Sequence, residues 1–307
     1  MITDAALAED ALRAASRLPL RRRAWISVLH SSALAERNPS SALRNATGDV
    51  LGHALCPSRP EVVDYGRRLV GDAAKRLDVD GLEIEATGFH GWAHGSRHDK
   101  AGVLVDQVRN FLLSICFCEG CSAAIHEAGG VASQCRDAFA DAVRASLSHE
   151  RIEPLESFVA AEPLALVLEA RARIVERYTA AVLDSAGTLP VLIHAGADPI
   201  ATGSRAALPA SVLAQLPVRP EGVVVSTDGL DDATAAVAMR SAVAEYGASA
   251  WISIRVQRPD IVSRESLSAR LSEARELGVG GVRLHNLGLW NEAQLGWVRS
   301  STAARKG

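Results

Sequence analysis

The sequence predicts an α/β protein whose strands form a parallel sheet of the (β/α)8 TIM-barrel type. Six short runs rich in β-branched residues recur along the chain, and each is followed by a longer stretch with helical spacing. The expected strands are residues 24–30, 79–86, 189–195, 222–227, 248–256 and 279–286. The expected helices include residues 60–77, 106–115, 165–186, 232–246 and 264–277. No glycine-rich phosphate loop follows the first strand, which disfavours a doubly wound dinucleotide-binding sheet.

The number of strands does not complete a barrel. A closed barrel of this type has eight strands, so six leave the first two βα units missing. The chain also begins with a helical pattern over residues 4–17, as though it started midway through a unit. Two explanations remain open: an open or shortened variant, or a longer parent that has lost its first two units, which we favour. No linker divides the 307 residues, so we expect one domain.

Composition excludes several classes of protein. The formal net charge is −3 and no cluster of basic residues stands out, so nucleic acid is not an expected partner. No signal-peptide pattern and no apolar run of ~18 residues occur, so we expect no membrane partner and a cytoplasmic location. The abundance of alanine and arginine indicates the codon bias of a high-GC bacterium.

Five cysteines in a reducing compartment indicate metal binding rather than disulfides. Cys116, Cys118 and Cys121 have the spacing C-x-C-x-x-C, which lets one tight turn present three thiolates to one ion. Tetrahedral Zn²⁺ needs four ligands, and a closed Cys₄ shell is structural rather than catalytic. We expect Cys56 to be the fourth ligand, with His126 as the alternative.

Other interpretations of these cysteines stay open. An iron–sulfur cluster would use the same thiolates. Three close cysteines are also compatible with a plain hydrophobic core. Cys135 is left over in every case and is expected to be a buried, inert thiol.

Three segments carry a resemblance to a known family. They read Cys-Pro-Ser-Arg-Pro-Glu-Val-Val-Asp-Tyr (56–65), Val-Asp-Gly-Leu-Glu-Ile-Glu (79–85) and Cys-Phe-Cys-Glu-Gly-Cys (116–121). This pattern resembles the hypothetical glycosyl-hydrolase-like barrels and is similar to the zinc-containing bacterial β-galactosidases. In those enzymes, one cysteine early in the barrel joins a C-x-C-x-x-C after the fourth strand to hold a structural zinc. The resemblance covers about residues 24–125. It implies that residues 24–30 and 79–86 are the third and fourth strands and that carbohydrate is the partner.

Two carboxylates are the candidate catalytic groups, because glycoside hydrolysis needs an acid and a base or nucleophile on either side of the bond. Glu83 and Glu85 alternate with apolar residues and should both point into the barrel, with Glu85 nearer the mouth. We expect Glu85 to be the acid/base; the alternative is a core carboxylate paired with Arg255 or Arg283. Asp228 is the expected partner.

The expected mechanism departs from that of the β-galactosidases. Residues 251–257 offer no acid where those enzymes place the nucleophile, and their Asn-Glu pair is replaced here by Ile84-Glu85. Asp228 follows a strand that is not adjacent to the strand of Glu85. That separation favours inversion over retention.

Polar residues at the other strand ends, and the loop of residues 87–99, are the expected sugar contacts. Aromatic faces stack on the C–H side of a sugar ring, and polar groups bind its hydroxyls. The expected substrate-binding residues are Glu83, His90, Trp92, His94, His98, His194, Arg255, Gln257, Arg283 and His285.

The sequence thus favours a glycoside hydrolase and leaves two alternatives. One is a non-catalytic carbohydrate-binding or degenerate barrel. The other is a metal-dependent lyase or hydrolase, in which His94 and His98 bind a catalytic metal with His194 or His285. An open barrel edge would also favour a homo-oligomer.

Overall fold

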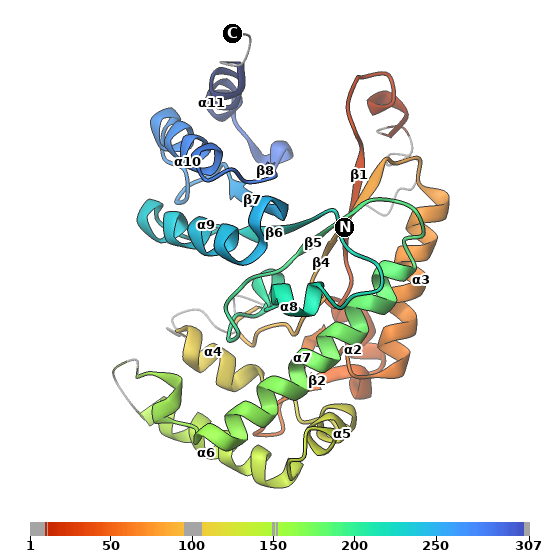
Figure 1. The fold of residues 1–307 in the computed structure, drawn as a ribbon, viewed down its shortest axis with the longest axis vertical. Helices are drawn as coiled ribbons and strands as arrows, with labels where there is room; N and C mark the ends of the chain where they lie inside the picture. Colours follow the sequence, from red (N-terminus) through yellow and green to blue (C-terminus); the bar gives the residue numbers. More distant parts are fainter. Residues whose placement is uncertain (1–9, 11, 95–105, 149–150, 152, 304–307) are drawn as a thin grey trace.

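The computed structural model describes residues 10, 12–94, 106–148, 151 and 153–303 (Figure 1). Six parallel strands form one curved sheet that curls as part of a barrel, in the order β1-β4-β5-β6-β7-β8. They are β1 (Arg23–Ser27), β4 (Gly81–Glu85), β5 (Val191–His194), β6 (Gly222–Ser226), β7 (Ala250–Arg255) and β8 (Gly281–His285). Within the described residues, β1 and β8 are the two edges of this sheet. The predicted fold class, a partial TIM barrel, is confirmed.

Several helices also agree with the expected stretches to within a few residues. They are α3 (Pro60–Arg76), α7 (Ala161–Asp184), α9 (Asp232–Tyr246) and α10 (Arg264–Glu276). The short α8 (Ala210–Leu213) and α11 (Glu292–Ala303) were not among the expected helices. Of the helix expected over residues 4–17, the structure describes residues 10 and 12–17, and residues 10 and 12–15 of these are helical. In the part of the chain that the structure describes, no helix is both long and apolar enough to cross a bilayer.

Two insertions lie between strands, and of their elements only the helix Gln107–Ser114 was expected from the sequence. Between β1 and β4, the chain forms α2 (Ser32–Arg37) and an antiparallel pair, β2 (Ala42–Arg44) with β3 (Val50–Leu55). Between β4 and β5, it forms α4 (Gln107–Ser114), α5 (Glu119–Glu127) and α6 (Ala132–Ser148) ahead of α7. The two insertions are in contact. The Phe117 N–H donates to the Arg44 carbonyl at 2.8 Å, and Asn45 and Cys116 form an isolated antiparallel β-bridge.

The alternation predicted for β4 is present. Leu82 and Ile84 are fully buried in a core that also contains Tyr178 and Val182 of α7. Successive side chains of a strand point to opposite faces, so Glu83 and Glu85 lie on the concave face of the sheet. The carboxyl ends of the strands therefore carry polar groups on the inside of the curve.

The Trp251 indole occupies the part of the sheet formed by β6, β7 and β8. A Cβ atom placed on Gly222 would lie 2.6 Å from Trp251 Cδ1, and one placed on Gly281 would lie 2.6 Å from Trp251 Cζ3. Both distances are too short for carbon atoms that are not bonded. Glycine at these positions therefore makes room for the ring.

We predict that Gly281→Ala destabilises the protein by about 1–3 kcal/mol, because the new methyl group overlaps the rigid Trp251 ring, which also lies against Gly222. Urea denaturation measures the change. Gly296→Ala is the matched control: it lies within α11 with open space around it, so alanine should be neutral or slightly stabilising. Equal stability of the Gly281 variant and the wild type would contradict this packing.

Candidate functional site

Three of the predicted site residues form one buried network on the concave face. Glu83 Oε1 lies 2.6 Å from His194 Nε2 and 2.6 Å from Arg283 Nε. Arg283 Nη1 also donates to Ser253 Oγ at 3.1 Å. The network joins β4, β5, β7 and β8 across the inside of the curve, so it stabilises the curvature of the sheet as well as the site.

The charge state of Glu83 follows from this network. Burial raises the pKa of Glu83, but the hydrogen bond with His194 and the positive charge of Arg283 outweigh it and leave the pKa below its usual value. Glu83 is therefore a carboxylate at neutral pH. The core ion pair that the sequence offered as an alternative for Glu85 is formed by Glu83 instead.

Trp25 was not identified from the sequence. Its ring lies under the Arg283 guanidinium, 4.2 Å from the ring centroid, and is nearly parallel to the His194 ring at 6.1 Å. Half of Trp25 is exposed, at 51%. Trp25 pairs in register with Glu83, so its position on an alternating strand was the signal that could have identified it.

A second cluster of polar side chains lies at the carboxyl ends of β6, β7 and β8. His285 Nε2 lies 3.0 Å from the Asp228 carboxylate, and His285 Nδ1 lies 2.8 Å from Asn286 Oδ1. Burial raises the pKa of Asp228, but the hydrogen bond and charge of His285 outweigh it, so the pKa is lowered. The Gln257 amide contacts the backbone of Asn286 at 3.3 Å.

Arg255 forms an ion pair with Asp260, a residue of the loop that follows its own strand. Asp260 folds back from the loop after β7 and accepts two bonds from Arg255, at 2.6 and 3.0 Å. Asp260 also accepts the Gly229 N–H at 2.7 Å, directly after Asp228. Arg255 thus stabilises the loop that carries Asp228.

Glu85 differs from the other polar strand residues. It is half-buried at the end of β4, and its carboxylate makes no hydrogen bond or ion pair with any described residue. The next residue, Ala86, has a φ of 63°, a left-handed conformation that costs a non-glycine residue roughly 1 kcal/mol or more. A strained turn therefore follows a carboxylate that the fold leaves without a partner.

The histidines of the loop after β4 form a cluster with histidines from other segments of the chain. The rings of His90 and His94 contact those of His30 and His53, two residues that sequence reasoning missed. Trp92 is half-buried and packs against the hydrophobic core. His98 lies outside the described residues. His194 and His285 are not part of this group, because they pair with Glu83 and Asp228.

Four cysteines converge as the spacing predicted. Cys56 Sγ lies 3.8, 3.6 and 3.5 Å from the Sγ atoms of Cys116, Cys118 and Cys121, and all four residues are buried. A tetrahedral ion with metal–sulfur bonds of ~2.3 Å requires S···S separations of ~3.8 Å. The His126 ring instead contacts the Gly130 carbonyl at 2.9 Å. The donor set therefore fits a metal ion held by sulfur alone.

The four buried sulfurs need a cation if all of them are to be thiolates. Burial raises the pKa of Cys56, so four neighbouring thiolates need a cation to be stable. The backbone N–H groups of Arg44 and Cys118 point at Cys116 Sγ, at 3.4 and 3.5 Å. Such bonds stabilise negative charge on sulfur.

Arg171 provides a buried positive charge in the same region. Its guanidinium lies 4.1 Å from the Phe89 ring centroid, and its Nη1 has no hydrogen-bond partner among the described residues. Burial lowers the pKa of Arg171 to about 10, and the charges of Cys121, Cys116 and Cys56 act against that shift. Arg171 has no carboxylate partner among the described residues, and the nearby cysteines act on its pKa as negative charges.

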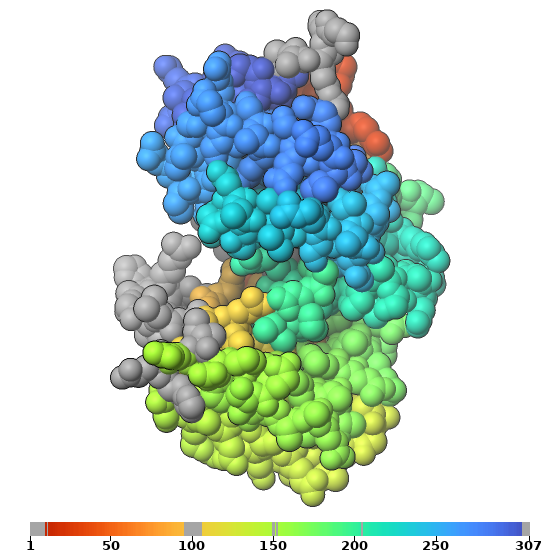
Figure 2. Space-filling model, turned by 60° about the vertical axis from the view of Figure 1, so that its left-hand side comes forward, coloured from red at the N-terminus to blue at the C-terminus, as the bar shows by residue number. Residues whose placement is uncertain are grey.

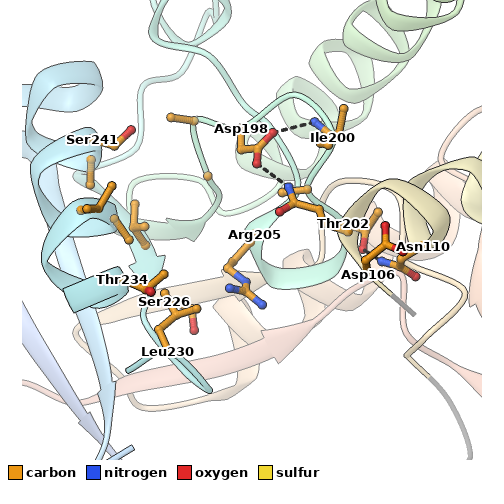
Figure 3. Close-up of a pocket in the computed structure, with 18 of the residues that line it drawn as sticks. Asp106, Asn110, Asp198, Ile200, Thr202, Arg205, Ser226, Leu230, Thr234 and Ser241 are labelled. Atoms are coloured by element: carbon orange, nitrogen blue, oxygen red, sulfur yellow. Dashed lines mark hydrogen bonds between the residues drawn. The ribbon is translucent and has the colours of Figure 1, made fainter. Parts of the chain in front are cut away.

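A cavity of about 500 Å³ lies beside the carboxyl ends of β5 and β6, bounded by α4 and α9. Figure 2 shows the surface hollowed between the cyan part of the chain, where α9 lies, and the yellow-green helices. Arg205 extends into it between Ser226 and Thr202 (Figure 3). None of the residues predicted from the sequence lines this cavity, although Ser226 and Leu230 flank Asp228 on either side.

Comparisons with known proteins identify the fold. No protein family matches the sequence, and neither does any curated protein. Among solved structures, the chain is similar to the catalytic domain of a β-amylase from Paenibacillus polymyxa, with a TM-score of 0.62 and 9% identity over 99% of this chain and 86% of that one. It is also similar to the PgaB (BpsB) glycoside hydrolase domain from Bordetella bronchiseptica, with a TM-score of 0.59 and 15% identity over 97% of this chain and 78% of that domain.

A third neighbour is longer than this chain. An α-L-fucosidase from Paenibacillus thiaminolyticus matches with a TM-score of 0.55 and 13% identity over 98% of this chain, which spans only 39% of the fucosidase. At these identities the likeness concerns the fold alone. The chain therefore has a glycosyl-hydrolase-like fold, a partial TIM barrel.

We predict that Glu83→Gln destabilises the protein by about 3 kcal/mol at pH 7, because Arg283 is left buried without its counter-charge. The pKa of Glu83 is lowered by folding. The Glu83–Arg283 pair therefore contributes its full stability above the pKa of Glu83 in the unfolded chain, ~4.3, and this stability is lost as the pH falls through the pKa of Glu83 in the folded protein. The difference from wild type should therefore shrink below about pH 4. Urea denaturation at several pH values measures it.

Glu276→Gln serves as the control for that series, because Glu276 is exposed on α10 and its loss should change little at any pH. A Glu83 variant whose loss of stability is the same at about pH 3 as at pH 7 would show that the ion pair is not the stabilising element.

Proposed function

We propose that this protein is a glycoside hydrolase that acts on a carbohydrate. The observation that carries the proposal is the Glu85 carboxylate, half-buried at the carboxyl end of a barrel strand and left without a polar partner among the described residues. Barrel enzymes place their catalytic groups at this end of the strands. The fold likeness to a β-amylase, a fucosidase and the PgaB glycoside hydrolase domain supports the same reaction class.

In the proposed mechanism, Glu85 is the acid that protonates the leaving oxygen and Asp228 is the base that activates water. Burial raises the pKa of Asp228, but His285 and Arg255 outweigh it and lower the pKa, so Asp228 is ionised at neutral pH, as a general base must be. Strand β5 lies between β4 and β6, so the strands that carry the two residues are two strand spacings apart, about 10 Å. Inverting enzymes hold their carboxyl groups ~6.5–9.5 Å apart and retaining enzymes ~5 Å, so the wide spacing of the strands supports inversion.

Four of the predicted contacts, His194, Gln257, Arg283 and His285, are proposed to bind the sugar. Arg283 and His194 on the concave face lie against Trp25, which offers an exposed aromatic surface. Gln257 and His285 lie at neighbouring strand ends. Glu83 and Arg255 are engaged in ion pairs and are proposed to be positioning residues. Glu83 positions Arg283, and Arg255 positions the loop that carries Asp228.

We also propose that the four cysteines bind a structural Zn²⁺. The resemblance to the zinc-containing β-galactosidases and the tetrahedral spacing of the sulfurs support zinc. A closed Cys₄ shell leaves no position for substrate, so the ion would link chain segments and take no part in hydrolysis. The solved β-galactosidase from Bacillus circulans sp. alkalophilus shares the fold, with a TM-score of 0.54 and 12% identity over 92% of this chain and 43% of that one.

A second candidate function is carbohydrate binding without catalysis. The exposed Trp25 ring favours it, because a half-exposed aromatic face on the inside of the sheet can bind a sugar without any acid or base. This candidate predicts sugar binding with no turnover.

We expect Glu85→Gln to lower kcat on aryl glycosides by at least about 100-fold, because the amide cannot protonate the leaving oxygen. Release of the coloured phenol measures the rate, and Glu276→Gln is the matched control. Wild-type protein that binds sugars but hydrolyses none of a broad aryl-glycoside panel would exclude the hydrolase and support the binding candidate.

We expect Cys118→Ser to purify without zinc and to unfold at a lower temperature, because the ion stabilises only the folded state that assembles the site. Elemental analysis and thermal denaturation measure the two effects. Cys135→Ser is the control, since Cys135 is buried on α6 outside the group of four and should leave the zinc content unchanged. Wild-type protein that is largely free of zinc would overturn the assignment.

A further inference from the structure

Four of the nine histidines of the chain meet beyond the carboxyl ends of β1 and β4. His30 follows β1, His53 lies in β3, and His90 and His94 lie in the loop after β4. Their ring centroids are separated by 4.6 Å at the closest pair, His30 and His94, and by 6.4 Å at the most distant, His53 and His90. Segments far apart in the sequence thus bring four imidazoles together.

His90 is the buried member of this histidine cluster. It is 3% exposed, and neither of its ring nitrogens has a hydrogen-bond partner among the described residues. A buried polar group without a partner costs about 1–3 kcal/mol, so a ligand for these nitrogens is expected. Imidazole nitrogens are common ligands of transition-metal ions.

The spacing of the rings fits a single ion at their centre. With metal–nitrogen bonds of ~2.0 Å, four imidazoles around a tetrahedral ion have ring centroids ~5 Å apart. The observed range of 4.6 to 6.4 Å brackets that value. Among the described residues, only the cysteine ligand atoms already converge within 4.8 Å of one another. Binding therefore requires the histidine rings to rotate about their side-chain torsions.

His53 already has the hydrogen bond that is typical of a metal-bound histidine. Its Nε2 lies 3.1 Å from the Gly91 carbonyl oxygen. Metal-binding histidines commonly donate one ring N–H to a backbone carbonyl, which fixes the ring and directs the other nitrogen at the ion. Nδ1 of His53 is then the ligand atom.

We propose that His30, His53, His90 and His94 bind one divalent transition-metal ion of the zinc, cobalt or nickel type, separate from the four-cysteine site. Nitrogen donors of this kind select such ions over Mg²⁺ or Ca²⁺, which prefer oxygen. This ligand set differs from the one suggested by the sequence, because His194 and His285 are held by carboxylates elsewhere. The proposal does not depend on glycoside hydrolysis.

Cobalt titration of the metal-free full chain tests the site, because the absorption of Co²⁺ reports its ligands. Cobalt bound by cysteines gives a sulfur-to-metal charge-transfer band, whereas cobalt bound only by nitrogen gives ligand-field bands without it. We expect two equivalents to bind, one of each type. Magnesium in excess should displace neither.

The variant His30→Ala/His94→Ala removes two exposed ligands and should weaken the nitrogen-bound equivalent by at least about 100-fold while the sulfur-bound equivalent persists. His126→Ala is the matched control, an exposed histidine on α5 outside the cluster. Retention of the charge-transfer band shows that the double variant is folded. A wild-type titration with only the sulfur-bound equivalent, or a nitrogen-bound equivalent unchanged in the double variant, would overturn the proposal.

Discussion

The meeting of four cysteine sulfurs is the constraint on which the two insertions of the sheet depend. Cys56 ends the β2–β3 insertion, and the other three cysteines begin α5 in the helical insertion, so two excursions from the sheet are joined at one point. Arg171 and Phe89 extend this contact to the loop after β4. The position of His53 relative to His90, and the path of the chain beyond Glu85, both follow from that junction.

The parts of the fold that could be predicted are those in which a local pattern is sufficient. β-Branched runs identified all six strands of the sheet, and their ends were overestimated by one to a few residues because a strand ends where its partner does. The β2–β3 pair was missed although its turn had a signal. Gly48 has a φ of 94°, and the Asn45 side chain accepts the Asp49 N–H at 2.8 Å, which closes a tight turn. β2 has only three residues, and Gly52 and His53 interrupt the apolar pattern of β3.

The spacing of residues along the sequence predicted part of the candidate site. The choice of ion-pair partners in the folded chain could not be predicted. The C-x-C-x-x-C spacing located three of the sulfurs, and strand alternation placed Glu83 and Glu85 on one face. No pattern in the sequence could show that Arg283 would choose Glu83 over Glu85, or that Asp260 would fold back onto Arg255. His30 and His53 lacked any motif, because their neighbours come from loops that only the curvature of the sheet brings together.

The long excursion between β4 and β5 has a consequence for how the chain reaches this structure. Leu82 pairs with Val191, so adjacent strands must close a loop of about one hundred residues. Contacts among α5, α6 and α7 span much shorter stretches and can form without the sheet. Pairing between strands distant in the sequence is intrinsically slow. We therefore expect the helical insertion to condense early and the joining of β4 to β5 to be a late event in folding.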